Sequence, residues 1–182
     1  MNTIAADRVA SIATYDPVAR GLHWLTALLV LAEYVVGFAM PHVHPAPPFA
    51  FLVEVHPVLG SGLLLIVPLR ILWRLIHRPP PPALHRRLAG VTHFLLYLTL
   101  ILMPLAGWAS ASADGYPVRA FGLLPLPALV PYRARIGFTL GMVHADVLYW
   151  ILLALIAMHV GAALYHRFVK HDSVLNRMLP GV

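Results

Sequence analysis

Histidine is the residue type in this chain best suited to chemistry. The 182 residues include 11 His and no Cys. Without Cys the chain has no disulfides, no thiolate zinc site, no iron–sulfur ligands and no C-x-x-C-H motif for covalent haem attachment. Two imidazoles on facing helices make a poor zinc site, because zinc takes four ligands. Haem iron needs only one or two axial ligands, and an iron with two axial imidazoles exchanges electrons without binding oxygen.

Four apolar stretches must position these histidines. Hydrophobic residues make up 60% of the chain, charged residues only 11%, and the mean hydropathy is +0.78. Soluble domains are about 45–50% apolar and about 25% charged, so the composition predicts a membrane protein. The spans are predicted at residues 21–40, 57–73, 92–109 and 145–165, since about 20 helical residues cross a bilayer core. The expected fold is an all-α bundle of four transmembrane helices, forming one domain over residues 1–182.

The basic residues predict the orientation of this bundle. Ten of the thirteen Lys and Arg residues lie in the N-terminal segment, in the link between the second and third spans, and in the tail. Cytoplasmic segments carry the Lys/Arg excess, so both termini are predicted to be cytoplasmic. The net charge of +6 is interpreted as topology rather than nucleic-acid affinity. On the outer side, residues 110–143 are predicted as either a short helix across the outer face or an irregular interfacial loop.

Four histidines sort into two pairs by depth. His144 and His159 lie on the same predicted span, fifteen residues or about 22 Å apart. His56 starts the second span on the outer side, and His23 lies near the inner end of the first. The expected pairs are therefore His56 with His144 outside and His23 with His159 inside. Bundle cores are where ligands from facing helices build such sites.

Several other polar residues within or near the spans have more than one interpretation. Arg70 is predicted to lie about 21 Å below His56, where it either pairs with a haem propionate or extends to the lipid headgroups. His93 and His166 either hydrogen-bond a propionate or line a quinone pocket, unless they are interfacial contacts. His166 is also the rival inner ligand, because it lies seven residues after His159. Glu33, a carboxyl within the first span, has no partner that the sequence identifies.

Several separate motifs, in order, resemble the bacterial cytochrome b561 family, which is related to the cytochrome b subunits of nickel–iron hydrogenases. The resemblance covers nearly the whole chain. It rests on YDPVARGLHW at residues 15–24, HPVLG at 56–60, RILWR at 70–74, PLAGW at 104–108, VRAFG at 118–122, MHVGAA at 158–163 and HRFVKHD at 166–172. Two departures are Pro57, where a longer polar residue is more usual, and Glu33.

The resemblance implies a multi-pass protein of the bacterial inner membrane that holds two non-covalent b-type haems and exchanges electrons with quinone in a respiratory chain. Its ligand histidines would be His23, His56, His144 and His159, in agreement with the depth pairing. The electron donor or acceptor, and the question of a homodimer, stay open. Alternative functions are a membrane-anchor subunit of a larger dehydrogenase or hydrogenase and, ranked low, a histidine-based metal transporter.

Overall fold

The computed structural model describes residues 14–40, 51–77 and 86–179. Helix α1 (Pro17–Ala39) begins where Asp16 caps it, because the Asp16 carboxylate accepts the Ala19 N–H at 2.9 Å. Pro17 suits the first helical position, where its missing N–H costs no hydrogen bond. Helix α2 (Phe51–Ile76) contains both Pro57 and Pro68. It begins six residues before the predicted start of the second span.

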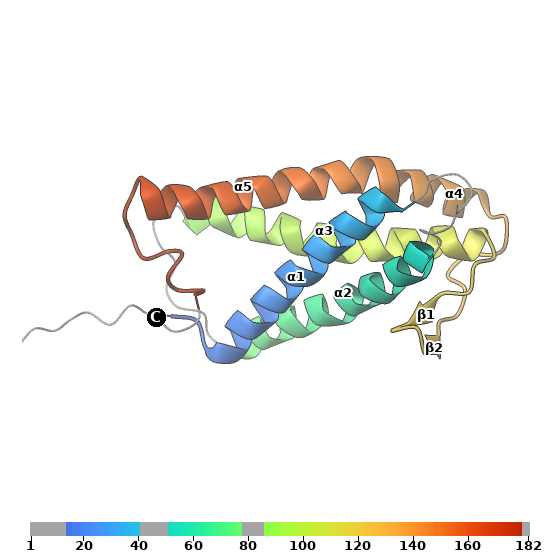
Figure 1. The fold of residues 1–182 in the computed structure, drawn as a ribbon, viewed down its shortest axis with the longest axis horizontal. Coiled ribbons are helices and arrows are strands. Elements are labelled where there is room, and N and C mark those ends of the chain that lie inside the picture. Colours follow the sequence, from blue (N-terminus) through green and yellow to red (C-terminus); the bar gives the residue numbers. More distant parts are fainter. Residues whose placement is uncertain (1–13, 41–50, 78–85, 180–182) are drawn as a thin grey trace, which may run out of the picture.

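The second half of the bundle is α3 and one long composite helix (Figure 1). Helix α3 (Arg86–Ala113) contains Pro104. A short antiparallel pair, β1 (Arg119–Ala120) with β2 (Leu124–Pro125), follows it. Then α4 (Arg135–Met142), the π-helical turn η1 (Val143–Leu148) and α5 (Tyr149–Phe168) continue one into the next. The predicted start of the fourth span at residue 145 was therefore ten residues too late, and α4 extends that span instead of lying across the outer face.

Four helices are long and apolar enough to cross a membrane, as predicted. These are Pro17–Ala39, Phe51–Ile76, Arg87–Ala113 and the 34-residue composite Arg135–Phe168. In each, less than a quarter of the most apolar window is buried inside the bundle, with a maximum of 22%. The remaining apolar surface therefore suits a lipid environment.

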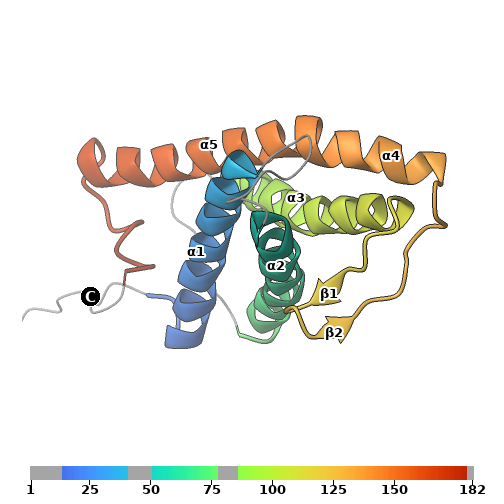
Figure 2. The ribbon, with the colours of Figure 1, turned by 45° about the vertical axis from the view of Figure 1, so that its right-hand side comes forward.

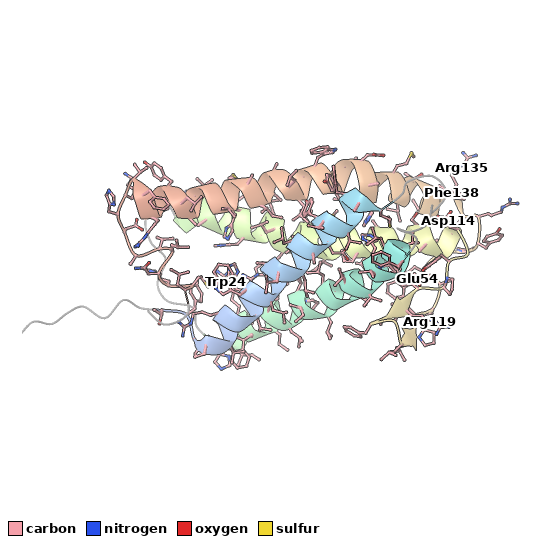
Figure 3. The ribbon with its side chains drawn as sticks, viewed as in Figure 1. Trp24, Glu54, Asp114, Arg119, Arg135 and Phe138 are labelled. Atoms are coloured by element: carbon pink, nitrogen blue, oxygen red, sulfur yellow. The ribbon has the colours of Figure 1, made fainter. Side chains whose placement is uncertain are left out.

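The described ends of the chain meet at one end of the bundle (Figure 2). The Tyr15 N–H donates to the Arg177 carbonyl at 3.2 Å, the Arg20 guanidinium to the Leu179 carbonyl at 2.9 Å, and the Trp24 indole to the Met178 carbonyl at 2.8 Å. The loop between α3 and α4 lies at the opposite end, where Figure 3 places Arg119 and Arg135. The first and last described residues of the chain thus lie on the same side of the membrane. That this side is cytoplasmic is a prediction from the distribution of Lys and Arg.

A layer of buried aliphatic side chains crosses the centre of the bundle. Its residues come from all four spans, and they are Val30, Leu63, Val67, Leu100 and Leu152. Val30, Leu63 and Leu152 each lie seven or eight residues from a histidine on the same helix, which is about 10 Å along the axis. The layer therefore lies between the outer and the inner histidines.

Candidate functional site

The outer pair predicted from depth, His56 and His144, lies together in the structure. Their ring centroids are 5.7 Å apart and their planes are inclined at 76°. His56 lies in the second turn of α2 and His144 in the π-helical turn η1. Single π-helical turns inside longer helices are frequent at functional sites. No Cα atom of α2 lies within 8 Å of η1 or α5 among the described residues, so only side chains span this gap.

The His144 ring is held by α3. Its Nδ1 donates to the Met103 carbonyl at 2.8 Å, which leaves Nε2 free as a ligand atom. Gly107 permits this approach, because a Cβ at position 107 would lie only 3.0 Å from Cε1 and 3.1 Å from Nδ1 of His144. The glycine of the PLAGW motif is therefore required by the histidine on the neighbouring helix.

A cavity of about 740 Å³ opens beside the outer pair. Mainly apolar side chains line it, together with a few polar groups that include Glu33, Tyr34, His56 and His144. Its volume lies within the range of about 300–1,000 Å³ that is typical of cofactor and ligand pockets. The cavity is thus large enough for a cofactor between the two imidazoles.

Sequence reasoning gave Glu33 no partner, and the structure supplies one. One carboxyl oxygen of Glu33 lies 2.6 Å from Nδ1 of His56. The two atoms are shielded from solvent and their contact lacks the alignment of a full hydrogen bond. A mid-span carboxyl is a signal of function in itself, but the side of α1 that faces His56 cannot be read from the sequence.

The inner pair, His23 and His159, also lies together, and His93 joins it. Ring centroids are 6.3 Å apart for His23 and His159, and 5.5 Å apart for His93 and His159. Among the described residues no Cα atom of α1 lies within 8 Å of α5, whereas α3 and α5 pack directly. The room for a flat group is therefore between His23 and His159.

Arg70 reaches the inner histidines from α2. Its guanidinium donates to Nδ1 of His23 at 2.8 Å and lies 5.4 Å above the ring centre of Tyr97. Since Arg only donates, the Nδ1 of His23 accepts, and the ring hydrogen is then on Nε2. Binding a metal through Nε2 requires Arg70 to turn away from His23 and the ring hydrogen to move to Nδ1.

The other histidines that the structure describes lie away from both pairs. His166, the rival inner ligand, donates from Nδ1 to the Asp172 carboxylate at 2.6 Å. His77 stacks on Trp73 with ring centroids 3.8 Å apart. His42, His44 and His85 fall outside the described residues. Within the part of the chain that the structure describes, no group of three or more His, Asp or Glu side chains could hold a bare metal ion.

Fold and geometry together define a multi-pass helical membrane protein with paired imidazoles inside its bundle. The chain belongs to the prokaryotic cytochrome b561 family, whose family model matches residues 14–181. It is therefore a cytochrome of the bacterial inner membrane, with b-type haem and a role in transmembrane electron transfer.

Curated relatives align over most of their length. The chain is 33% identical over 178 residues to cytochrome b561 homolog 2 of Escherichia coli, covering 91% of this chain and 90% of that protein. It is 30% identical to cytochrome b561 homolog 1 of the same organism, with 87% and 93% covered. It is also 33% identical to the probable superoxide oxidase CybB of Yersinia pestis, with 88% and 92% covered.

The two histidine pairs fit a haem iron by their spacing. A metal–imidazole bond of about 2 Å, with about 1 Å from the nitrogen to the ring centre, places two axial rings about 6 Å apart. The observed centroid separations are 5.7 Å and 6.3 Å. In each pair the helices that carry the two rings are also kept apart, as a macrocycle between them requires.

Proposed function

We propose that this cytochrome carries electrons across the membrane through two b-type haems, one near each end of the bundle. His56 and His144 would hold the outer haem, and His23 and His159 the inner one. Each haem would supply a one-electron couple to the path. The observation that carries the proposal is that each pair bridges two helices whose backbones do not touch among the described residues.

The chain's own residues orient these ligands and balance the charge of the cofactor. Met103 holds the His144 ring in the orientation that exposes Nε2. Arg70, a cation within the second span, would pair with an inner haem propionate, since a buried charge requires a partner. His93 lies at the edge of the same group, where it can donate to a propionate or to a quinone oxygen.

Quinone is the proposed redox substrate at the inner end of the bundle. His93 and His166 both lie on this side of the central aliphatic layer, and the Asp172 carboxylate fixes the ring of His166. His93 can donate a hydrogen bond to a quinone oxygen, whereas His166, whose Nδ1 hydrogen goes to Asp172, offers Nε2 as an acceptor for a quinol hydroxyl.

The name of one relative suggests the electron donor. One relative is named a probable superoxide oxidase, so we propose superoxide as the donor at the outer end. Two superoxide ions would each give up one electron and leave as dioxygen, while one quinone takes both electrons and two protons. Arg119, Arg133 and Arg135 form an exposed cationic set on this side, which favours the approach of a small anion. The alternative donor is a larger dehydrogenase or hydrogenase that uses this chain as its membrane anchor.

The test is a pyridine haemochrome assay on the purified protein, with protein quantified independently. We expect about two protohaems per chain, and a count of zero or one would overturn the two-haem proposal. Superoxide consumption by the isolated protein in the presence of quinone then distinguishes the two donors. An anchor subunit would instead stay inactive with superoxide and co-purify with a soluble catalytic partner.

A further inference from the structure

Glu33 and His56 form a contact that the relay itself does not require. Glu33 lies on α1 ten residues after His23, at the level of the outer cavity. Its carboxyl oxygen lies 2.6 Å from Nδ1 of His56, and the two side chains are only 13% and 29% exposed. A carboxyl is costly at such depth unless it is paired. Among the described titratable side chains His56 is in direct contact with it, while His144 and Tyr34 line the same cavity.

The neighbouring backbone leaves space for this carboxyl. Gly60 lies one turn after His56 on α2, and a Cβ at that position would lie 3.3 Å from the second oxygen of Glu33. A larger side chain there would push the carboxyl away from the imidazole. Gly60 and Glu33 therefore act together to keep one oxygen within reach of Nδ1.

We propose that Glu33 is a positioning residue of the outer haem site, an inference that rests on the proposed function. In the haem-bound protein its carboxyl would accept the Nδ1 hydrogen of His56, once the ring turns into the alignment that the present 2.6 Å contact lacks, and Nε2 would then face the iron. A carboxyl acceptor also increases the electron donation of a ligating imidazole. Stronger donation stabilises the ferric state, so Glu33 lowers the reduction potential of the outer haem.

The groups that contact the ligand histidines differ between the outer and the inner site, and this difference gives the electron path a direction. His144 has a neutral acceptor, the Met103 carbonyl, whereas His56 has a carboxyl. The inner site has the opposite neighbour, because the Arg70 guanidinium lies beside His23 and would stay near the inner haem after turning to its propionate. A cation near a haem favours the ferrous state. The outer haem is therefore the lower-potential centre, and electrons pass from the outer haem to the inner one.

The experiment is a potentiometric titration of the holoprotein with Glu33→Leu, Glu33→Gln and Gly60→Ala, combined with electron paramagnetic resonance of the ferric haems. Haem content is measured first for every variant. Glu33→Leu should raise the potential of one haem by about 59 mV or more, which is a tenfold change in its redox equilibrium. The low-spin resonance signal of that haem should shift too. The other haem should keep its reduction potential and its resonance signal.

Three further variants keep the inference falsifiable. Glu33→Gln retains an acceptor oxygen, so its resonance signal should stay nearer the parent than that of Glu33→Leu. Gly60→Ala should shift the same haem in the same direction by a smaller amount. The control Glu54→Gln removes one exposed carboxylate from α2, two residues before His56, and should leave both potentials unchanged.

The outcomes separate the inference from the proposed function. Unchanged potentials and signals in Glu33→Leu, with two haems retained, would overturn the role of Glu33 and leave the relay standing. An equal shift of both haems, or a Glu33→Gln signal identical to that of Glu33→Leu, would also overturn it. A parent protein without two haems would instead remove the proposed function, and the inference with it.

Discussion

His159 faces His93 at 5.5 Å and His23 at 6.3 Å between ring centroids, but only the second of these pairs spans an open gap. The helices of the first pair, α3 and α5, pack against each other, whereas α1 and α5 approach within 8 Å at no described Cα pair. Packed helices have axes about 8–10 Å apart, and side chains fill the space between them. The shorter distance therefore marks a neighbour, and the longer one fits the ligand pair.

Replacing His93 should accordingly differ from replacing His23. We expect His93→Ala to retain both haems, while His23→Ala loses the inner one, because a single imidazole would remain at that site. Haem stoichiometry and the low-spin resonance signals measure the difference. Loss of an iron signal in His93→Ala would show that the inner ligand is misassigned.

Gly107→Ala should impair the outer haem without removing a ligand. The added methyl carbon would lie 3.0 Å from the His144 ring, so the ring must move away from Met103. Changes beside a ligand typically weaken metal binding about 10- to 100-fold, and we expect a loss of that size in haem titrations of the apoprotein. Gly90→Ala is the control on the same helix, since a Cβ there meets nothing within 4 Å. Equal affinities in the two variants would contradict the role of Gly107.

Arg70→Gln should weaken retention of the inner haem. A guanidinium–propionate pair is a charge-assisted interaction worth about 1.5–3 kcal/mol, so we expect a loss of affinity of roughly tenfold to a hundredfold at this haem alone. Arg74→Gln, an exposed position one turn later on α2, is the matched control. The measurement is the rate of haem transfer to apomyoglobin. A faster transfer of the outer haem in Arg70→Gln would argue against the pairing.

Asp16→Ala should destabilise the start of α1 in a pH-dependent way. Burial raises the pKa of the Asp16 carboxyl, but hydrogen bonds from the Ala19 N–H and the Trp73 indole outweigh this effect, and the pKa lies below its usual 3.8. The cap therefore contributes stability above that pH and loses it as the pH falls through the lowered pKa. At pH 7 we expect a cost of about 1 kcal/mol, measured by thermal unfolding in detergent. The difference from the parent should shrink as the pH falls below 3.8 and through the lowered pKa, and a pH-independent difference would refute the assignment.

The depth of each histidine in the membrane could be predicted from the sequence. The direction in which a side chain points around its helix axis could not. The rise of a helix is constant, so the spacing of His144 and His159 gave their levels directly. The contact between Glu33 and His56 depends on how α1 is rotated against α2, which packing decides. The start of the fourth helix was placed too late because the Gly- and Pro-rich segment before it resembles a loop throughout.

His93 and Arg70 show the same limit at the inner site. Their depth was predicted correctly, but not the finding that His93 lies on a helix packed directly against α5. Similarly, sequence spacing left His166 as a rival ligand, since seven residues return to nearly the same face. The structure instead places it against Asp172, in the segment that follows α5.

The aliphatic layer formed by Val30, Leu63, Val67, Leu100 and Leu152 has a consequence for the energetics of the membrane. Electrons tunnel through packed hydrocarbon, whereas protons and hydrated ions need a polar route. Moving one charge across a potential of 100 mV involves about 2.3 kcal/mol, and an ion leak would dissipate that energy as heat. The aliphatic layer therefore lets the proposed relay conduct electrons while the membrane stays closed to ions and the cell keeps its ion gradients.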